Sequence, residues 1–225
     1  MTMSAGALAR GLSLAWAAGV AWEYRGLAYP HNAWVFHVHT VVGSIVVVAL
    51  VHGATASMGA RGEEKVKRAQ LLETHRRAML YGAAPLSLAA AAVMLGKKAL
   101  LDGRGWLLLS GRRPSLHSWG ALLWIACALP AALAAGLAIH KGGVGSAGAF
   151  LKGLGFPRRV LAPLHRLGGS AALMLVTYVI FQGLTEKNDK SERKVLAWLL
   201  VVIVGLIAMQ RLGKGTARGD DAKSQ

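Results

Sequence analysis

The sequence has one cysteine, Cys127, and few acidic residues: 10 Asp and Glu in 225 residues, against 26 Lys and Arg. A single cysteine excludes an intramolecular disulfide and a thiolate-ligated metal cluster. Apolar and polar residues do not alternate at period two, and the connecting segments mix Gly, Pro and charge, so a membrane β-barrel is not expected. The formal net charge of +16 comes without a nucleic-acid-binding motif, so nucleic acid is not an expected partner.

Charged residues are missing from four long stretches of a chain that is 54% apolar. These stretches are residues 26–60, 78–96, 114–140 and 167–185. Each is long enough to supply the roughly 20 helical residues that cross a hydrocarbon layer. Two shorter apolar runs, 11–22 and 195–210, are candidates for the first and last spans. We therefore predict an all-α integral membrane protein with six transmembrane helices, at residues 7–24, 34–57, 76–96, 115–139, 165–184 and 194–210.

The six spans are expected to form one domain, residues 1–212, followed by a polar, disordered tail, residues 213–225. One side of the membrane then carries 16 of the 26 Lys and Arg, and the positive-inside rule places both termini in the cytosol. A cleaved signal peptide is the alternative for the first span, because Arg10 precedes an apolar core and residues 17–21 are mostly small. Cleavage would leave five spans.

Histidines open each of the four inner spans: His37 and His39 the second, His75 the third, His117 the fourth and His165 the fifth. Successive helices run in opposite directions, so His117 and either His37 or His39 should lie near the outer face, with His75 and His165 near the cytosolic face. Ionisable side chains within spans usually face the bundle interior, where paired imidazoles can hold a metal or cofactor. A hydrogen-bonded packing role is the alternative for each histidine taken alone.

Small residues follow these histidines on the same helix faces, including Gly120 and Ala121 after His117 and Gly168 after His165. They provide the clearance that a flat macrocycle needs, although small residues are also common where membrane helices pack. A bare zinc or copper ion would more often add carboxylate or thiolate ligands, which are missing here. We therefore expect two b haems between the four central helices, each ligated by two histidines. Filled axial positions favour electron transfer over oxygen chemistry.

Two stretches of the sequence, "SLHSWGALLW" from Ser115 and "PLHRLGGSAALMLVTYVIFQGLTEK" from Pro163, resemble the fourth and fifth helices of the cytochrome b561 family. A looser resemblance covers residues 34–187. Members of this family are ascorbate-reducible membrane proteins with six helices and two b haems. Histidines of helices two and four bind one haem near the non-cytosolic face, and those of helices three and five bind the other. The resemblance implies as ligands His39 with His117 and His75 with His165.

The second span departs from the family pattern, because it reads "FHVHTVVG" where the family has His-Pro. His37 and His39 lie ~200° apart around a helix, so only one can face a haem. The 36-residue interval from His39 to His75 is nearer to the family's, which favours His39 and leaves His37 as the alternative ligand. The third loop is longer than in the family and lacks the aromatic residue that usually precedes "SLHSW". The acceptor at the outer face therefore stays open.

The resemblance also implies cytosolic ascorbate as the electron donor, bound by basic residues that shortly precede the inner histidines. The candidates are Lys67, Arg68, Arg158 and Arg159. Positive-inside topology and anionic lipid headgroups account for these residues equally well. Arg76 and Arg77 are candidates to neutralise haem propionates or to extend to the membrane interface. Arg112 and Arg113 are candidates to gather an anionic acceptor at the outer face, such as monodehydroascorbate or a ferric chelate.

The expected function is transmembrane electron transfer from cytosolic ascorbate, through two haems, to monodehydroascorbate or a ferric chelate. The family resemblance adds a homodimer. A histidine-dependent transporter without haem is the alternative, since intramembrane histidines can relay protons, but the spans contain few carboxylates and no twinned broken helices. His52 and His140 fall toward cytosolic helix ends and are expected in hydrogen-bonding roles, and His31 in a loop.

Overall fold

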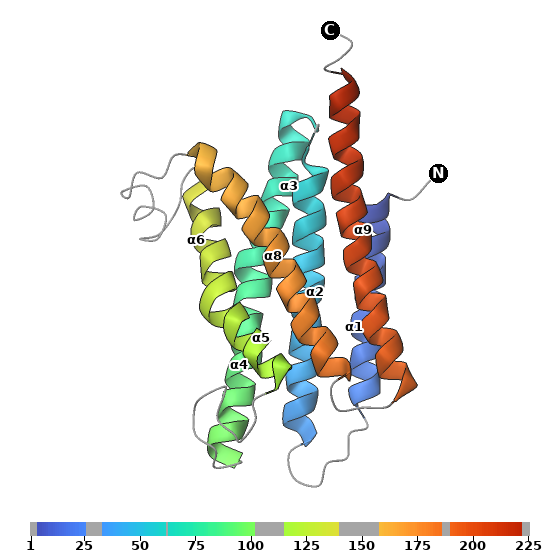
Figure 1. The fold of residues 1–225 in the computed structure, drawn as a ribbon, viewed down its shortest axis with the longest axis vertical. Helices are drawn as coiled ribbons and strands as arrows, with labels where there is room; N and C mark the ends of the chain where they lie inside the picture. Colours follow the sequence, from blue (N-terminus) through green and yellow to red (C-terminus); the bar gives the residue numbers. More distant parts are fainter. Residues whose placement is uncertain are drawn as a thin grey trace.

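Helical rods that run alternately up and down make up the part of the chain that the computed structural model describes (Figure 1). That part comprises residues 4–25, 33–61, 63–101, 115–139, 158–185 and 190–221. Its six rods are α1 (Ala5–Tyr24), α2 (Ala33–Gly59), a third rod of α3 (Lys65–Arg77), η1 (Ala78–Ala83), α4 (Ala84–Gly96) and η2 (Lys97–Leu101), a fourth of α5 (Leu116–Leu123), η3 (Trp124–Ala128) and α6 (Leu129–Ile139), then α8 (Arg158–Thr185) and α9 (Ser191–Asp221). The predicted all-helical class is confirmed.

Four of the six rods are long and apolar enough to cross a membrane: Trp34–Gly59, Lys65–Leu101, Leu116–Gly136 and Val160–Thr185. They correspond to the four charge-free stretches of the sequence. That α1 and α9 also span the membrane stays a prediction, as does disorder of residues 213–225, of whose side chains nothing is described. The third rod begins at Lys65 rather than at residue 76, because the intervening segment is rich in good helix formers such as Lys, Arg, Gln, Leu and Glu.

Two π-helical segments interrupt the central rods, and each lies just before a proline. η1 ends two residues before Pro85, and η3 ends two residues before Pro130. Proline has no N–H to donate to the preceding turn and its ring crowds that turn, so the helix widens there. The widened turns change which side chains face the neighbouring rods. η1 begins three residues after His75, and π segments of this kind often accompany functional sites.

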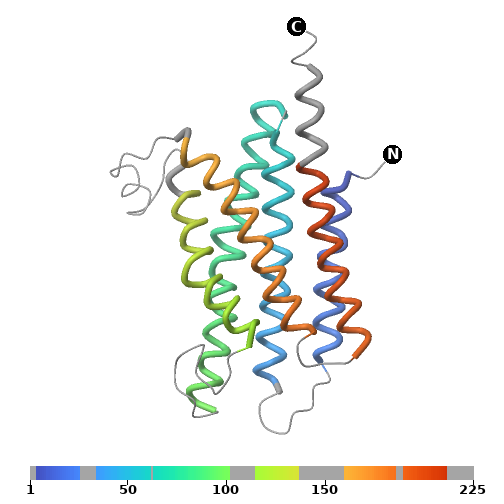
Figure 2. The backbone as a smooth tube through the Cα atoms, viewed as in Figure 1, coloured from blue at the N-terminus to red at the C-terminus, as the bar shows by residue number. Residues whose placement is uncertain are grey.

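The four central rods form two layers. In one layer α2 packs along α3, η1 and α4, and in the other α5 and α6 pack along α8, whereas contacts between the layers are sparse. α1 and α9 pack against each other, and each also contacts one layer, α1 through α2 and α9 mainly through α8 (Figure 2). The most completely buried side chains belong to this outer pair, among them Trp16, Leu200 and Ile203. The tightest packing is therefore not between the central layers.

A polar clamp joins α1 to α9. The Trp16 indole Nε1 donates a hydrogen bond of 2.8 Å to the Leu196 carbonyl. The Arg193 guanidinium binds Glu23 at 3.1 Å and lies over the Tyr24 ring at 4.6 Å. Arg193 is only 2% exposed, so its charge depends on this carboxylate.

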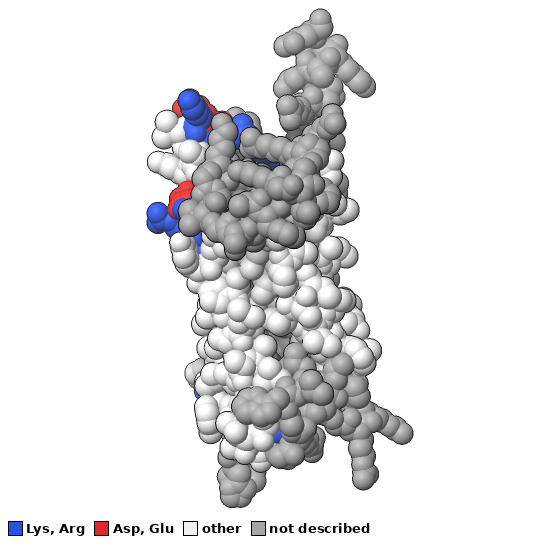
Figure 3. All heavy atoms as spheres, turned by 90° about the vertical axis from the view of Figure 1, so that its left-hand side faces the viewer, with Lys and Arg blue, Asp and Glu red and all other residues white. Residues whose placement is uncertain are grey.

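The starts of α1, α3 and α8 mark one end of the bundle, the upper end in Figure 1. The starts of α2, α5 and α9 mark the lower end. On the face shown in Figure 3, the described Lys and Arg gather at the two ends, and the band between them is uncharged. This distribution is the one expected of a bundle that spans hydrocarbon.

Candidate functional site

Four of the predicted histidines meet in two pairs across the gap between the central layers. His39 on α2 faces His117 on α5, with ring centroids 6.1 Å apart and the ring planes at 86°. His75 on α3 faces His165 on α8, with centroids 6.0 Å apart and planes at 77°. The first pair lies toward the lower end and the second toward the upper end, because neighbouring rods are antiparallel. These are the two pairs that the sequence leads us to expect.

The spacing of both pairs is that of two imidazoles on one metal ion. A metal–imidazole bond is about 2 Å long, and a ring nitrogen lies about 1.1 Å from its centroid, so two opposed ligands place their centroids about 6.2 Å apart. A direct hydrogen bond of about 2.9 Å between two ring nitrogens would bring the centroids to about 5.1 Å. The observed 6.1 and 6.0 Å agree with the first arrangement.

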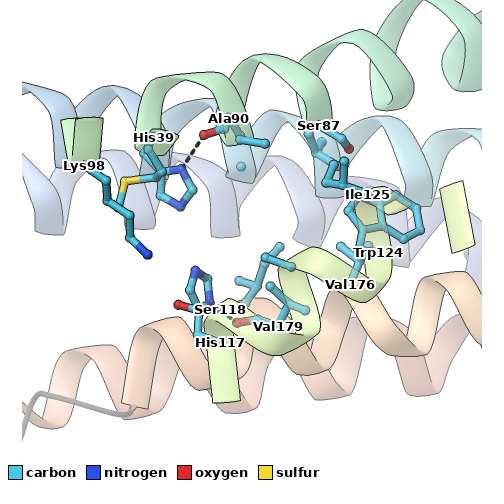
Figure 4. Close-up of a pocket in the computed structure, with 16 residues that line it drawn as sticks. His39, Ser87, Ala90, Lys98, His117, Ser118, Trp124, Ile125, Val176 and Val179 are labelled. Carbon is cyan, nitrogen blue, oxygen red and sulfur yellow. Dashed lines mark hydrogen bonds between the residues drawn. The ribbon is translucent and has the colours of Figure 1, made fainter. Parts of the chain in front are cut away.

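Backbone carbonyls orient three of the four rings. The Nδ1 atoms of His39, His75 and His117 donate to the carbonyls of Ala90, Gly53 and Val179, at 3.0, 2.9 and 2.7 Å respectively. A carbonyl can only accept, so Nδ1 carries the proton and Nε2 keeps a lone pair. Figure 4 shows the second nitrogen of His39 and of His117 directed into the gap between them. A ligating histidine held in this way has its tautomer and its direction fixed.

Glycines on neighbouring helices make room for three of the rings. A Cβ atom built on Gly183 would lie 3.0 Å from His117 Nδ1, and one on Gly136 would lie 3.2 Å from His165 Cε1. A Cβ on Gly53 would lie 3.5 Å from His75 Nδ1. Sequence reasoning missed these glycines and the three carbonyl partners. Their one sequence signal is a small residue in an apolar span, which most membrane helices share.

A cavity separates His39 from His117 (Figure 4). Its empty volume is about 760 Å³, including the open mouth. Cofactor sites usually hold about 300–1,000 Å³ and are lined mainly by apolar side chains. Apolar residues, among them Val46, Ile125 and Val176, form most of this lining.

The small residues expected to clear space for a macrocycle divide into two kinds. Ala121 lines the cavity, and so does Gly43, where an added Cβ would meet nothing within 4 Å. A Cβ on Gly120 would lie 2.6 Å from Val179 Cγ2, so this glycine lets α5 approach α8 instead. The expectation for Gly120 is therefore wrong. Near His165, a Cβ on Gly168 would meet nothing within 4 Å.

Within the described residues, no three His, Cys, Asp or Glu side chains converge as a metal site. Each histidine pair would thus supply two ligands, and the remaining ligands of a metal ion would have to belong to the cofactor itself. A tetrapyrrole meets this requirement, because it provides four nitrogens and leaves two axial positions for protein.

The remaining histidines differ in their surroundings. His39, not His37, faces His117, and the buried Nδ1 of His37 has no hydrogen-bond partner among the described residues. The buried Nε2 of His52 likewise lacks a partner there, so its expected hydrogen bond is not found at that atom. His31 and His140 lie outside the described residues.

The basic residues proposed from the sequence are placed in part. Lys67 forms an ion pair with Glu63 at 2.9 Å, and Arg68 is exposed on α3. Both Arg76 and Arg77 bind Glu73, at 2.7 and 2.8 Å, so each already has a carboxylate partner on its own helix. The side chains of Arg158 and Arg159, and all of Arg112 and Arg113, lie outside the described part.

A cationic cluster near the upper end, formed by Arg61, Arg166 and Arg211, was missed by sequence reasoning. Burial, and then the charges of Arg166 and Arg211, lower the pKa of Arg61 below its ordinary value. Arg166 directly follows His165, and Arg211 donates a hydrogen bond to the Ser170 hydroxyl one turn further along α8. The three arginines come from the α2–α3 turn, α8 and α9, so no local pattern in the sequence announces them.

Comparison with known proteins gives no family and no relative: no family model matches the sequence, and no curated protein is similar to it. The chemistry of the site must therefore be argued from its own geometry. The two histidine pairs, their carbonyl partners and the apolar cavity are the features that a proposal has to explain.

Proposed function

We propose that this chain is a membrane electron-transfer protein that holds two b haems, each between two histidines. The observation that carries the proposal is the pair of 6.1 and 6.0 Å imidazole separations at opposite ends of the gap between the central layers. The apolar cavity beside His39 and His117 supports it, because its size and lining suit a flat hydrophobic cofactor. The spacing and the donor set thus fit a bis-histidine haem.

The chain's own residues have distinct tasks in this proposal. His39 and His117 hold one haem, and His75 and His165 hold the other. A haem iron with two axial imidazoles takes up or gives away one electron by alternating between ferric and ferrous. The carbonyls of Ala90, Gly53 and Val179 keep Nδ1 protonated, which leaves Nε2 for the metal and makes it a more basic ligand.

The donor and acceptor follow from charge and from the resemblance to the cytochrome b561 family. We assign the upper end to the cytosol, with both termini on that side. Cytosolic ascorbate, an anion at neutral pH, would be attracted there by the cluster of Arg61, Arg166 and Arg211, and by Arg68. Monodehydroascorbate or a ferric chelate would take the electron at the lower end, where Arg112 and Arg113 are candidates to bind it. A homodimer is part of the same proposal.

Haem content and ligand substitution test the proposal. The full chain, purified from membranes, should contain two haems per chain and show a sharp visible band on addition of ascorbate. His117→Ala and His165→Ala should each remove one haem, because each leaves an iron with a single protein ligand. A folded but colourless protein would favour the histidine-dependent transporter. Two haems with unchanged spectra in both variants would refute the assigned ligands.

A further inference from the structure

Lys98 is the only Lys, Arg, Asp or Glu among the 16 described residues that line the cavity between His39 and His117. It lies in line with Met94, Ala91 and Ser87, four, seven and eleven residues earlier, so the cavity-facing stripe of α4 continues into η2. In Figure 4 its ammonium lies in the opening between the two layers, beside both imidazoles. An ammonium near an apolar cavity is costly unless an anion compensates for it.

The neighbouring lysine points elsewhere. The Lys97 Nζ lies over the Phe36 ring, 5.0 Å from its centroid, and Lys97 does not line the cavity. The two consecutive lysines therefore belong to different surroundings although they share the same end of the bundle. Lys97 is thus a matched control for any effect of charge at this end.

We propose that Lys98 binds a carboxylate at the edge of the ligand that His39 and His117 hold, namely a propionate of the haem. This inference rests on the proposed function and adds to it the direction in which the cofactor lies: its acidic edge faces the mouth at Lys98. A positive charge in a low-dielectric cavity favours the state with one more electron. Lys98 therefore raises the reduction potential of this haem relative to the one held by His75 and His165.

Redox titration of the purified full chain, without donor or acceptor, tests this role. In Lys98→Met the length and apolar stem are kept but the charge is lost. At a fixed potential the ratio of reduced to oxidised iron should fall about tenfold, or about 59 mV, for one of the two haems only. Lys98→Arg should keep the wild-type value, because it keeps the charge, and Lys97→Met should leave both haems unchanged.

The outcomes separate this inference from the proposed function. Wild-type protein without haem refutes the proposed function, whereas two haems with unchanged potentials in Lys98→Met refute only the role of Lys98. Equal shifts in Lys97→Met and Lys98→Met also refute it, since they show a general effect of surface charge. So does a slower reaction of Lys98→Met with an anionic acceptor at unchanged potentials, because Lys98 would then serve the acceptor.

A second measurement needs no substitution of Lys98, in case Lys98→Met does not fold. Reductive methylation of lysines is compared between wild-type protein and the His117→Ala variant, which is expected to lack this haem. A propionate partner should protect Lys98 in the wild type and leave it reactive in the variant. Lys97 should react equally in both. Equal reactivity of Lys98 in the two proteins contradicts the inference.

Discussion

Gly183→Ala should weaken binding of the haem at His117 without removing either ligand. An added Cβ would lie 3.0 Å from Nδ1 and 3.1 Å from Cε1 of His117, closer than ordinary van der Waals contact. The ring cannot retreat freely, because Nδ1 is tied to the Val179 carbonyl by a bond of 2.7 Å on the same helix as Gly183. The substitution must therefore either break this hydrogen bond or turn the ring away from His39.

The cost follows from these two contacts. Loss of the hydrogen bond is worth about 1 kcal/mol, and overpacking of a filled site costs about 1–3 kcal/mol. A net loss of about 1–3 kcal/mol corresponds to about 5- to 150-fold weaker binding of this haem. The haem at His75 and His165 should be unaffected, since Gly183 packs against His117.

Transfer of haem to an excess of haem-free myoglobin measures this affinity, with the two haems followed by their visible bands. Gly205→Ala is the control, because a Cβ at that position on α9 would meet nothing within 4 Å. Both substitutions gain the same helix propensity of about 1 kcal/mol, so a difference between them isolates the contact with His117. Equal haem loss from Gly183→Ala, Gly205→Ala and wild type would show that His117 does not need this space.

Further predictions concern other parts of the site and the fold. His39→Ala should lose one haem and His37→Ala none, as measured by haem per chain, because only His39 faces His117; loss in both variants would contradict this. Arg193→Met should lower the free energy of unfolding by about 3–5 kcal/mol, since Glu23 loses its buried partner, and Glu23→Gln in the same chain should restore part of it in thermal unfolding. Arg166→Ala should raise KM for ascorbate several-fold at unchanged haem content; an unchanged KM would remove it from the donor site.

The sequence predicts the helices well because hydropathy is a local property of the chain. The charge-free stretches coincide with the four rods that are long and apolar enough to cross a membrane. Helix ends are predicted less well: α3 begins at Lys65, and charged residues extend the rod beyond the apolar stretch. The turns η1 and η3 follow from Pro85 and Pro130, but the type of widened turn is seen only in the structure.

The alternation of helix direction and the position of each histidine in its span determine the depth at which each imidazole lies. The sequence therefore specifies, by itself, that imidazoles are paired near two opposite ends of a helical bundle. Only the tertiary structure decided that His39 rather than His37 faces His117, that Gly183 and Gly136 make room for rings, and that Arg61 approaches Arg166 and Arg211. The physical reason is that depth depends on each segment alone, whereas the rotation of a helix about its axis depends on the side chains of the helices packed against it.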